Sequence, residues 1–400
     1  MNTADAPIHI DTLLALLLVA SATSVITKWI RVPYAVALVI AGLIIGLSRV
    51  MAPVSMTPDL VLLIFLPALL FEAAWNLDIK ALRRDWLSIG SLATLGVVVC
   101  MFAVAAVLHF VGNMSMQTAL LFGAMVSATD PVSVIALFRK MGIDERLTMI
   151  MEGESLFNDG TAVVLFKIVL ALEIAHSPFS FGNTVAAFLL VVLGGALLGT
   201  ALGLVASWVT KAFDDHLLEI TLTMATAYGA VLAADYFHVS SVISVVAAGI
   251  VVGNYGGRTS ISETNRREVN LIWEYAAFLG NSILFLLIGL QVQADLLVKY
   301  SHLICLGVLA VFLARLLVVY GISPFVSTQQ LPIPNTWRHL LFWGGLRGAL
   351  VMALALSLPL TFPDREALIN MTFGVVLFTI LVPGLSMESL VRRLGLGSGN

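Results

Sequence analysis

Long apolar stretches follow one another along almost the whole chain, and they limit what it can fold into. Thirteen can be distinguished, and most have the ~17–25 residues that a membrane-spanning helix needs. Only 11% of the residues are charged, whereas a soluble domain has about 25%. We therefore expect an all-α polytopic membrane protein with about thirteen transmembrane helices. The expected spans are residues 11–30, 33–49, 57–75, 87–111, 115–138, 147–174, 180–210, 216–236, 240–254, 271–293, 300–326, 338–360 and 366–386.

The basic residues divide unevenly between the loops on the two sides of these spans. Loops after odd-numbered spans hold fifteen Lys and Arg, loops after even-numbered spans hold three, and three more lie within spans. Because positively charged loops stay in the cytoplasm, we expect the N-terminus outside and the C-terminus inside a plasma membrane. No loop is long enough to form a domain, so residues 1–400 are expected to be a single membrane domain, typical of a prokaryotic inner membrane.

The rest of the composition excludes several classes of function. A net charge of −3 and the lack of any basic run argue against binding of nucleic acid, which leaves membrane lipid as the expected surrounding. Cys100 and Cys305 each stand alone in an apolar span, so they predict no disulfide, metal site or nucleophile. No H-E-x-x-H, G-x-S-x-G or Walker A motif occurs, so we expect neither an enzyme nor a cofactor.

The sixth span carries many polar groups between Met151 and Phe166, where the sequence reads MEGESLFNDGTAVVLF. A carboxylate at bilayer depth is costly unless it is paired or hydrated, so such residues indicate a functional site. On a helix, Ser155 and Asp159 are four residues apart and share a face, whereas Glu154 points about 140° away from Asp159. We interpret the first face as an ion site and the second as an internal salt-bridge anchor.

Pro131 should interrupt the fifth span, because proline lacks a backbone N–H and clashes with the preceding turn. Thr129 and Asp130 lie beside this break, and half-helix ends near mid-membrane hold cations in transporters. Asp130 lies about 22 Å of helix from the outer end of its span, and Asp159 about 18 Å from the inner end of the sixth span. We expect the two acids to meet near the midplane. The alternative is that Asp130 only stabilises a kink.

The twelfth span contains a second weak point, the sequence GGLRG from Gly344 to Gly348. Two interrupted helices are expected of inverted repeats that cross at a substrate site, which would bring half-helix ends together. Arg347 could then neutralise either carbonyl ends or an acid. The alternative is that these glycines only allow close packing of helices.

Two further charged residues need an explanation at membrane depth. Arg315 lies near the middle of the eleventh span, and a buried arginine without an anion is very unfavourable. We expect it to pair with Glu154, the alternative being that it competes with the transported cation. Glu72, near the cytoplasmic end of the third span, could line an inner funnel, bind the ion through water, or be a solvated helix-end charge.

The chain resembles the sodium/proton antiporters of the monovalent cation:proton antiporter superfamily, in particular their electroneutral NhaP-like branch. The resemblance covers about 380 residues. The motifs that carry it are FLPALLFE (Phe65 to Glu72), SATDPV (Ser127 to Val132), EGESLFNDGTAVV (Glu152 to Val164), Ala314–Arg315, GGLRGAL (Gly344 to Leu350) and FTILVPGLS (Phe378 to Ser386). It implies a homodimer with a dimerisation part, about 11–75 and 180–293, and a moving core, about 87–174 and 300–386.

The resemblance also implies roles for the polar residues of the fifth and sixth spans. Asp159 would be the main carrier of cation and proton, and Asp130 would join it. Ser155 and Thr129 would complete the site, and Asn158 would bridge to the unwound stretch. Asparagine at position 158, where other exchangers have a second aspartate, resembles the branch that exchanges one cation for one proton.

We therefore expect a secondary antiporter that exchanges Na⁺ or Li⁺ for H⁺ by alternating access, with the two ions competing for Asp159 and Asp130. One alternative is a sodium-coupled solute symporter with a related crossed-helix fold. Another is an intramembrane aspartyl protease, since such an enzyme also needs paired acids.

Overall fold

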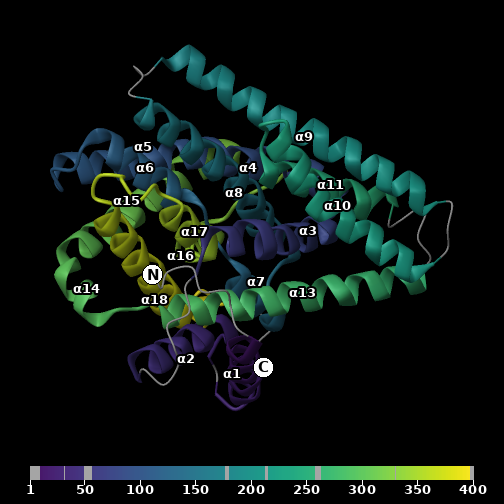
Figure 1. Cartoon of the computed structure of the whole chain (residues 1–400), viewed down its shortest axis with the longest axis horizontal. Coiled ribbons are helices and arrows are strands. Elements are labelled where there is room, and N and C mark those ends of the chain that lie inside the picture. The colour runs from purple at the N-terminus through teal and green to yellow at the C-terminus, as the bar shows by residue number, and fades with distance from the viewer. Residues whose placement is uncertain are drawn as a thin grey trace. The chain divides into compact units, whose positions relative to one another are not determined.

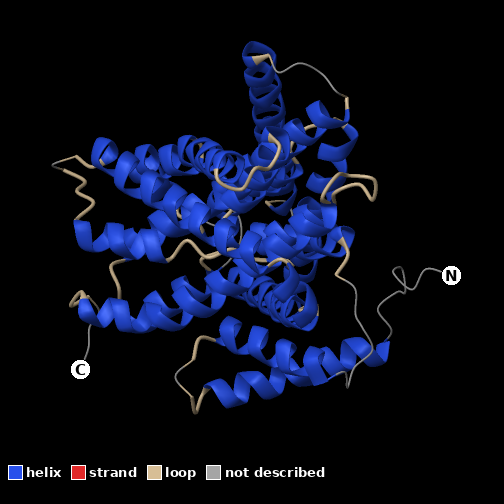
Figure 2. Ribbon diagram, turned by 90° about the vertical axis from the view of Figure 1, so that its left-hand side faces the viewer, coloured by secondary structure: helices blue, strands red, loops and turns tan. Residues whose placement is uncertain are grey.

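The computed structural model describes residues 10–30, 32–48, 56–175, 180–211, 215–256, 263–328 and 330–396, and this part of the chain is helical without strands (Figure 2). The elements, labelled in Figure 1, are α1 (Ile10–Thr27), α2 (Tyr34–Ser48), η2 (Leu60–Phe65), α3 (Leu66–Asn76), α4 (Ile79–Ala93), α5 (Leu95–Phe110), α6 (Met116–Ser127), α7 (Val132–Met141), α8 (Glu145–Ile174), α9 (Phe181–Thr210), α10 (His216–Tyr236), α11 (Ser241–Val251), η3 (Val252–Gly256), α13 (Glu263–Leu290), α14 (Ala294–Lys299), α15 (Ser301–Val326), α16 (Asn335–Trp343), α17 (Ala349–Leu356) and α18 (Arg365–Arg393). The predicted all-α class is therefore confirmed.

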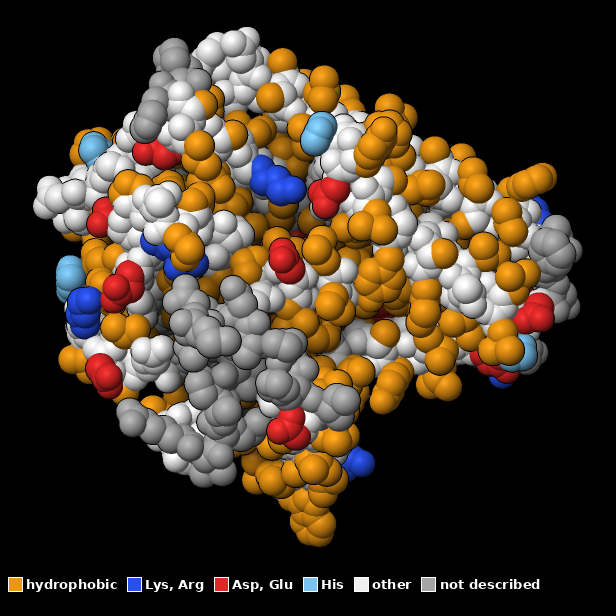
Figure 3. All heavy atoms as spheres, viewed as in Figure 1, with side chains coloured by type: hydrophobic (Ala, Val, Ile, Leu, Met, Phe, Trp, Pro, Cys, Tyr) orange, Lys and Arg blue, Asp and Glu red, His pale blue; other side chains and the backbone are white. Residues whose placement is uncertain are grey.

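Within the described residues, eight helical stretches are long and apolar enough to cross a membrane, with α4–α5 and α6–α7 each counted as one, and four more apolar helices are shorter. Large apolar side chains are exposed on them, such as Leu197 and Trp208 of α9. Figure 3 shows apolar side chains over much of the visible face, with few charged ones between them. Apolar surface of this extent fits contact with lipid.

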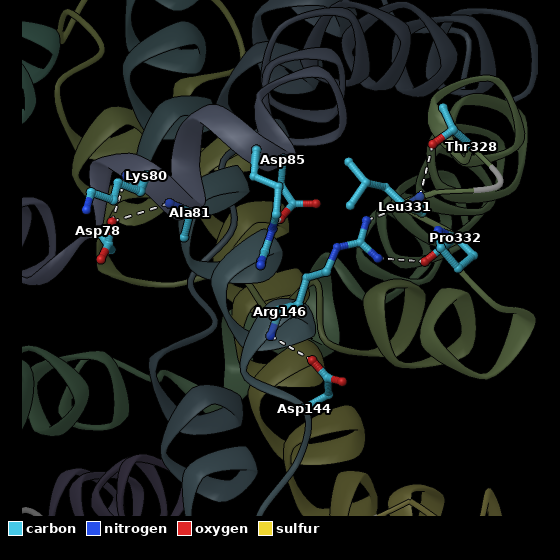
Figure 4. Close-up of polar contacts among 10 residues, drawn as sticks. Asp78, Lys80, Ala81, Asp85, Asp144, Arg146, Thr328, Leu331 and Pro332 are labelled. Carbon is cyan, nitrogen blue, oxygen red and sulfur yellow. Dashed lines mark hydrogen bonds and ion pairs between the residues drawn. The ribbon is translucent and has the colours of Figure 1, made fainter.

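The predicted start of the fourth span is wrong. The sequence analysis places it at residue 87, with Lys80, Arg83 and Arg84 in the preceding loop, but α4 already begins at Ile79. The Asp78 carboxylate caps it by accepting hydrogen bonds from the backbone N–H of Lys80 (2.6 Å) and Ala81 (3.3 Å), as Figure 4 shows. The first turns of α4 are amphipathic, so a search for apolar stretches does not find them.

The chain forms two compact units. Unit 1 comprises residues 1–61, 99–148 and 281–400, and unit 2 comprises residues 62–98 and 149–280. In unit 2, α11 packs against α3, α9 and α10. An added Cβ at Gly199 of α9 would lie 2.7 Å from the carbonyl carbon of Ser244, and one at Gly253 would lie 2.9 Å from that of Trp75. These helix pairs therefore meet backbone to backbone.

In unit 1, α18 contacts α2, α6, α7, α14, α15, α16 and α17 and is therefore the helix around which the others pack. The segment before α16 is held by Arg146 of α8, whose guanidinium donates to the carbonyl oxygens of Pro332 (2.8 Å) and Leu331 (3.2 Å), as Figure 4 shows. The Arg146 guanidinium also lies 5.5 Å from the ring centre of Trp337, in the first turn of α16. These contacts fix where α16 begins.

Candidate ion-binding site

The predicted break at Pro131 is confirmed. Helix α6 ends at Ser127 and α7 begins at Val132, so residues 128–131 are not helical. Pro131 cannot donate the hydrogen bond that would continue α6, and it occupies the position before the first turn of α7. The Ser127 hydroxyl folds back onto the carbonyl of Ala124 (2.7 Å), which closes the last turn of α6.

The second predicted break is also confirmed. Helix α16 ends at Trp343 and α17 begins at Ala349, with residues 344–348 non-helical between them. Both breaks lie in unit 1. They touch, because the backbone N–H of Asp130 donates to the carbonyl of Leu346 (2.8 Å). The interrupted helices therefore meet through their main chains.

Gly348 is needed for this contact. A Cβ added to it would lie 2.5 Å from the Cβ and 2.7 Å from the Cγ of Asp130, and closer still to one carboxylate oxygen. The Asp130 carboxylate therefore lies against the residue that precedes α17. Its other oxygen accepts a hydrogen bond from the N–H of Val132 (3.2 Å), in the first turn of α7. One carboxylate thus faces the amino-terminal ends of two half-helices, where negative charge is favoured.

The carboxyl-terminal ends of the other two half-helices face arginines. Arg347 is 1% exposed, and its guanidinium donates to the carbonyls of Val126, the second-last residue of α6 (2.9 Å), and of Gly345. Arg315 donates twice to the carbonyl of Leu341 in α16 (2.8 and 3.2 Å). A helix that stops leaves its last carbonyls without intrahelical partners. The arginines donate to these carbonyls. Of the two partners predicted for Arg347, carbonyl ends or an acid, the structure shows the carbonyl ends.

The polar residues of the sixth span lie on α8, which runs unbroken through them. Ser155 and Asp159 are therefore one turn apart on one face, as the spacing predicted. Glu154 and Asn158 are almost fully buried, at 2% and 1% exposed, Ser155 is buried, and Asp159 is half-buried. The meeting of Asp159 with Asp130, and the ion pair of Glu154 with Arg315, stay predictions.

Two other predicted residues, Thr129 and Glu72, lie on different elements. Thr129 is buried in the non-helical link before α7. Glu72 is half-buried near the end of α3, where its carboxylate accepts a hydrogen bond from the side-chain amide of Asn76 (2.7 Å).

Sequence reasoning missed Thr379 of α18, whose hydroxyl oxygen accepts a hydrogen bond from the backbone N–H of Arg347 (3.1 Å). The motif FTILVPGLS, which contains Thr379, was the available signal.

The sequence profile of one family, described as "Sodium/hydrogen exchanger, transmembrane", matches residues 13–393. The chain belongs to this family. An exchanger of this family is a transporter that crosses the membrane several times, so the protease alternative is excluded.

Individual relatives of this exchanger are similar over most of their length. It is 42% identical to the low-affinity Na(+)/H(+) antiporter NhaS1 of Synechocystis sp. over 371 residues, which cover 92% of this chain and 70% of that protein. It is 35% identical to the Na(+)/H(+) antiporter NhaH of Halobacillus aidingensis over 398 residues, covering 96% and 97% of the two chains.

A solved structure supports the fold of the exchanger. The sodium proton antiporter MjNhaP1 of Methanocaldococcus jannaschii superposes with a TM-score of 0.81, over 96% of this chain and 98% of that chain. The two sequences are 21% identical, so this likeness establishes the fold alone.

Proposed function

We propose that this exchanger moves one Na⁺ or Li⁺ in one direction for one H⁺ in the other, without net charge movement. The observation that carries the proposal is the position of Asp130. Its carboxylate lies at the touching breaks of two interrupted helices, against Gly348 and bonded to the N–H of Val132. In a chain of the sodium/hydrogen exchanger family, a carboxylate at such a crossing is the natural ligand for the transported ion.

Competition for the same oxygens would couple the two ions. A carboxylate far from water is costly while it is charged, and either a cation or a proton removes that cost. Both neutralise the same oxygen atoms, so only one can be bound at a time. We assign the main carrier role to Asp159, with Asp130, Ser155 and Thr129 as further ligands.

The supporting residues would keep this site in shape. Asn158 is buried and directly precedes Asp159 in α8, and its side chain would bridge to the non-helical stretch of the fifth span. Glu154 would pair with Arg315, and Glu72 would lie on the inner approach to the site.

Transport would follow from movement of a core, about residues 87–174 and 300–386, against a scaffold, about 11–75 and 180–293, within a homodimer. The eight long apolar helices, the four shorter ones and the interrupted pair α16–α17 would supply thirteen spans. The N-terminus would lie outside and the C-terminus in the cytoplasm of a prokaryotic inner membrane.

The test uses the purified protein in proteoliposomes that contain a pH-sensitive dye. Addition of Na⁺ or Li⁺ is expected to move protons in the opposite direction, at a rate that an imposed membrane potential leaves unchanged. Asp159→Asn and Asp130→Asn are each expected to abolish the signal. Asp235→Asn, the same change at an exposed end of α10, serves as the matched control.

Two results would contradict the proposal. Full exchange by either site variant would remove that carboxylate from the mechanism. Sodium-dependent uptake of an organic solute, without opposite movement of protons, would favour the symporter instead.

A further inference from the structure

Three hydroxyl residues lie on one face of α18. Thr372, Thr379 and Ser386 are spaced by seven residues, which is two turns of helix. Thr379 and Ser386 belong to the motif FTILVPGLS, which has no assigned role in the exchange proposed above. Helix α18 contacts both halves of both interrupted helices, so its face can act on the crossing (Figure 1).

Two of the three hydroxyls bond to the second interrupted helix. The Thr379 oxygen accepts the backbone N–H of Arg347 (3.1 Å) and donates its own proton to the carbonyl of Val376 (3.0 Å). The Ser386 oxygen accepts the indole N–H of Trp343 (2.8 Å) and donates to the carbonyl of Val382 (2.6 Å). The two acceptors therefore hold Trp343, the last residue of α16, and Arg347, in the second half of the non-helical stretch.

The bond to Thr379 replaces one that the break removes. In a continuous helix the N–H of Arg347 would donate to the carbonyl four residues earlier, but residues 344–348 are not helical. Arg347 and Thr379 are each 1% exposed, so water does not replace the missing partner. The neighbours of Arg347 on both sides, Leu346 and Gly348, are the residues that contact Asp130. Fixing the main chain at Arg347 therefore fixes the surroundings of the Asp130 carboxylate.

We propose that Thr379 and Ser386 are positioning residues, which hold the interrupted helix at one register and thereby set the place of Asp130 in the ion site. The proposal rests on the exchange function proposed above. The motif FTILVPGLS then has a physical role: Thr379 supplies an acceptor to the backbone N–H of Arg347, and Ser386 supplies one to the indole of Trp343.

The first test compares Thr379→Val with Thr379→Ser. Valine keeps the shape and removes the acceptor, and serine keeps the acceptor. Thr379→Val is expected to raise the KM for Na⁺ about tenfold and to shift the pH profile of exchange, as loss of a buried hydrogen bond at a site would. Thr379→Ser should stay within about twofold of the wild type. Thr372→Val is the matched control, since Thr372 is fully buried and its hydroxyl has no hydrogen-bond partner within the described residues.

The second test is a double-mutant cycle on the other bond. Trp343→Phe and Ser386→Ala each remove one partner, so each is expected to raise the KM for Na⁺ and the double variant should be no worse than the single ones. If Thr379→Val does not fold, this cycle still tests whether a hydroxyl of α18 positions the interrupted helix. Fully additive effects would overturn the proposed role of this bond.

Amide hydrogen exchange of residues 344–348 gives a readout that does not need transport. Thr379→Val should speed it, and Thr372→Val should not. Unchanged amide exchange, an unchanged KM, or equal damage by Thr379→Val and Thr379→Ser would each overturn the proposal for Thr379. A wild type without Na⁺-driven proton movement would refute the exchange function only, and amide exchange would then judge the contact by itself.

Discussion

Gly348→Ala is the sharpest perturbation of the crossing, because it adds one methyl group where the Asp130 side chain lies. The new Cβ would be 2.5 Å from the Cβ of Asp130, whereas ordinary contacts begin near 3.4 Å. Asp130 must therefore retreat by about 1 Å, although its N–H is bonded to Leu346 and its carboxylate to Val132. Overpacking of this kind costs about 1–3 kcal/mol. A displacement of about 1 Å at a reacting group can also cost on the order of 100-fold in rate.

The expected result is exchange lowered by one to two orders of magnitude, with only a moderate fall in melting temperature. Na⁺-driven pH change in proteoliposomes and thermal unfolding in detergent measure the two effects. Gly321→Ala is the matched control: Gly321 lies in α15 of the same unit and has open space around the added Cβ. It should keep full exchange and gain about 0.5–1 kcal/mol, since glycine destabilises a helix interior. Wild-type exchange by Gly348→Ala would refute the close approach of Asp130 to α17.

Two further predictions concern the packing of unit 2. Asn254→Ala should lower the melting temperature, because the buried side chain bonds three main-chain groups around the α3–α4 link and the end of α11, and each group left unsatisfied costs about 1–3 kcal/mol. Gly199→Ala should abolish stable folding, seen as lost monodisperse protein in size-exclusion chromatography, because its Cβ would meet the Ser244 main chain. Gly182→Ala, on the same helix with open space around it, should behave as wild type.

The membrane helices could be predicted from the sequence because the bilayer selects for the property that hydropathy measures. Helix α10 begins and ends at the predicted residues, His216 and Tyr236, and α9 differs by one residue. Both breaks could also be predicted, since proline and clustered glycine act on the backbone locally. These features depend on nearby residues alone.

The start of α4 could not be found in this way, because its first turns carry charge on one face. Lys80, Arg83 and Arg84 are exposed, whereas Asp85, Ser88 and Ile89 are buried. The periodicity and the Asp78 cap were present in the sequence. They are signals of an amphipathic helix, and a criterion based on mean apolarity discards them.

The main-chain partners of the buried arginines were harder to predict for a different reason. A sequence shows which acids are available to an arginine, and the pair of Arg315 with Glu154, which stays a prediction, rests on that alone. A sequence does not show which carbonyl groups lose their helical partners until both breaks are placed in space. The carbonyl of Leu341, which accepts two hydrogen bonds from Arg315, is such a group.

The crossing has four half-helix ends, and each faces a group of opposite charge. Asp130 faces the positive ends of α7 and α17, while Arg347 and Arg315 face the negative ends of α6 and α16. The same positive ends that stabilise the charged form of Asp130 oppose the approach of a cation to it. In the mechanism proposed above, Asp130 by itself would therefore bind Na⁺ weakly, and a second carboxylate would strengthen the binding. Asp159 is the proposed source, which is why both acids, rather than either one, should be required for exchange.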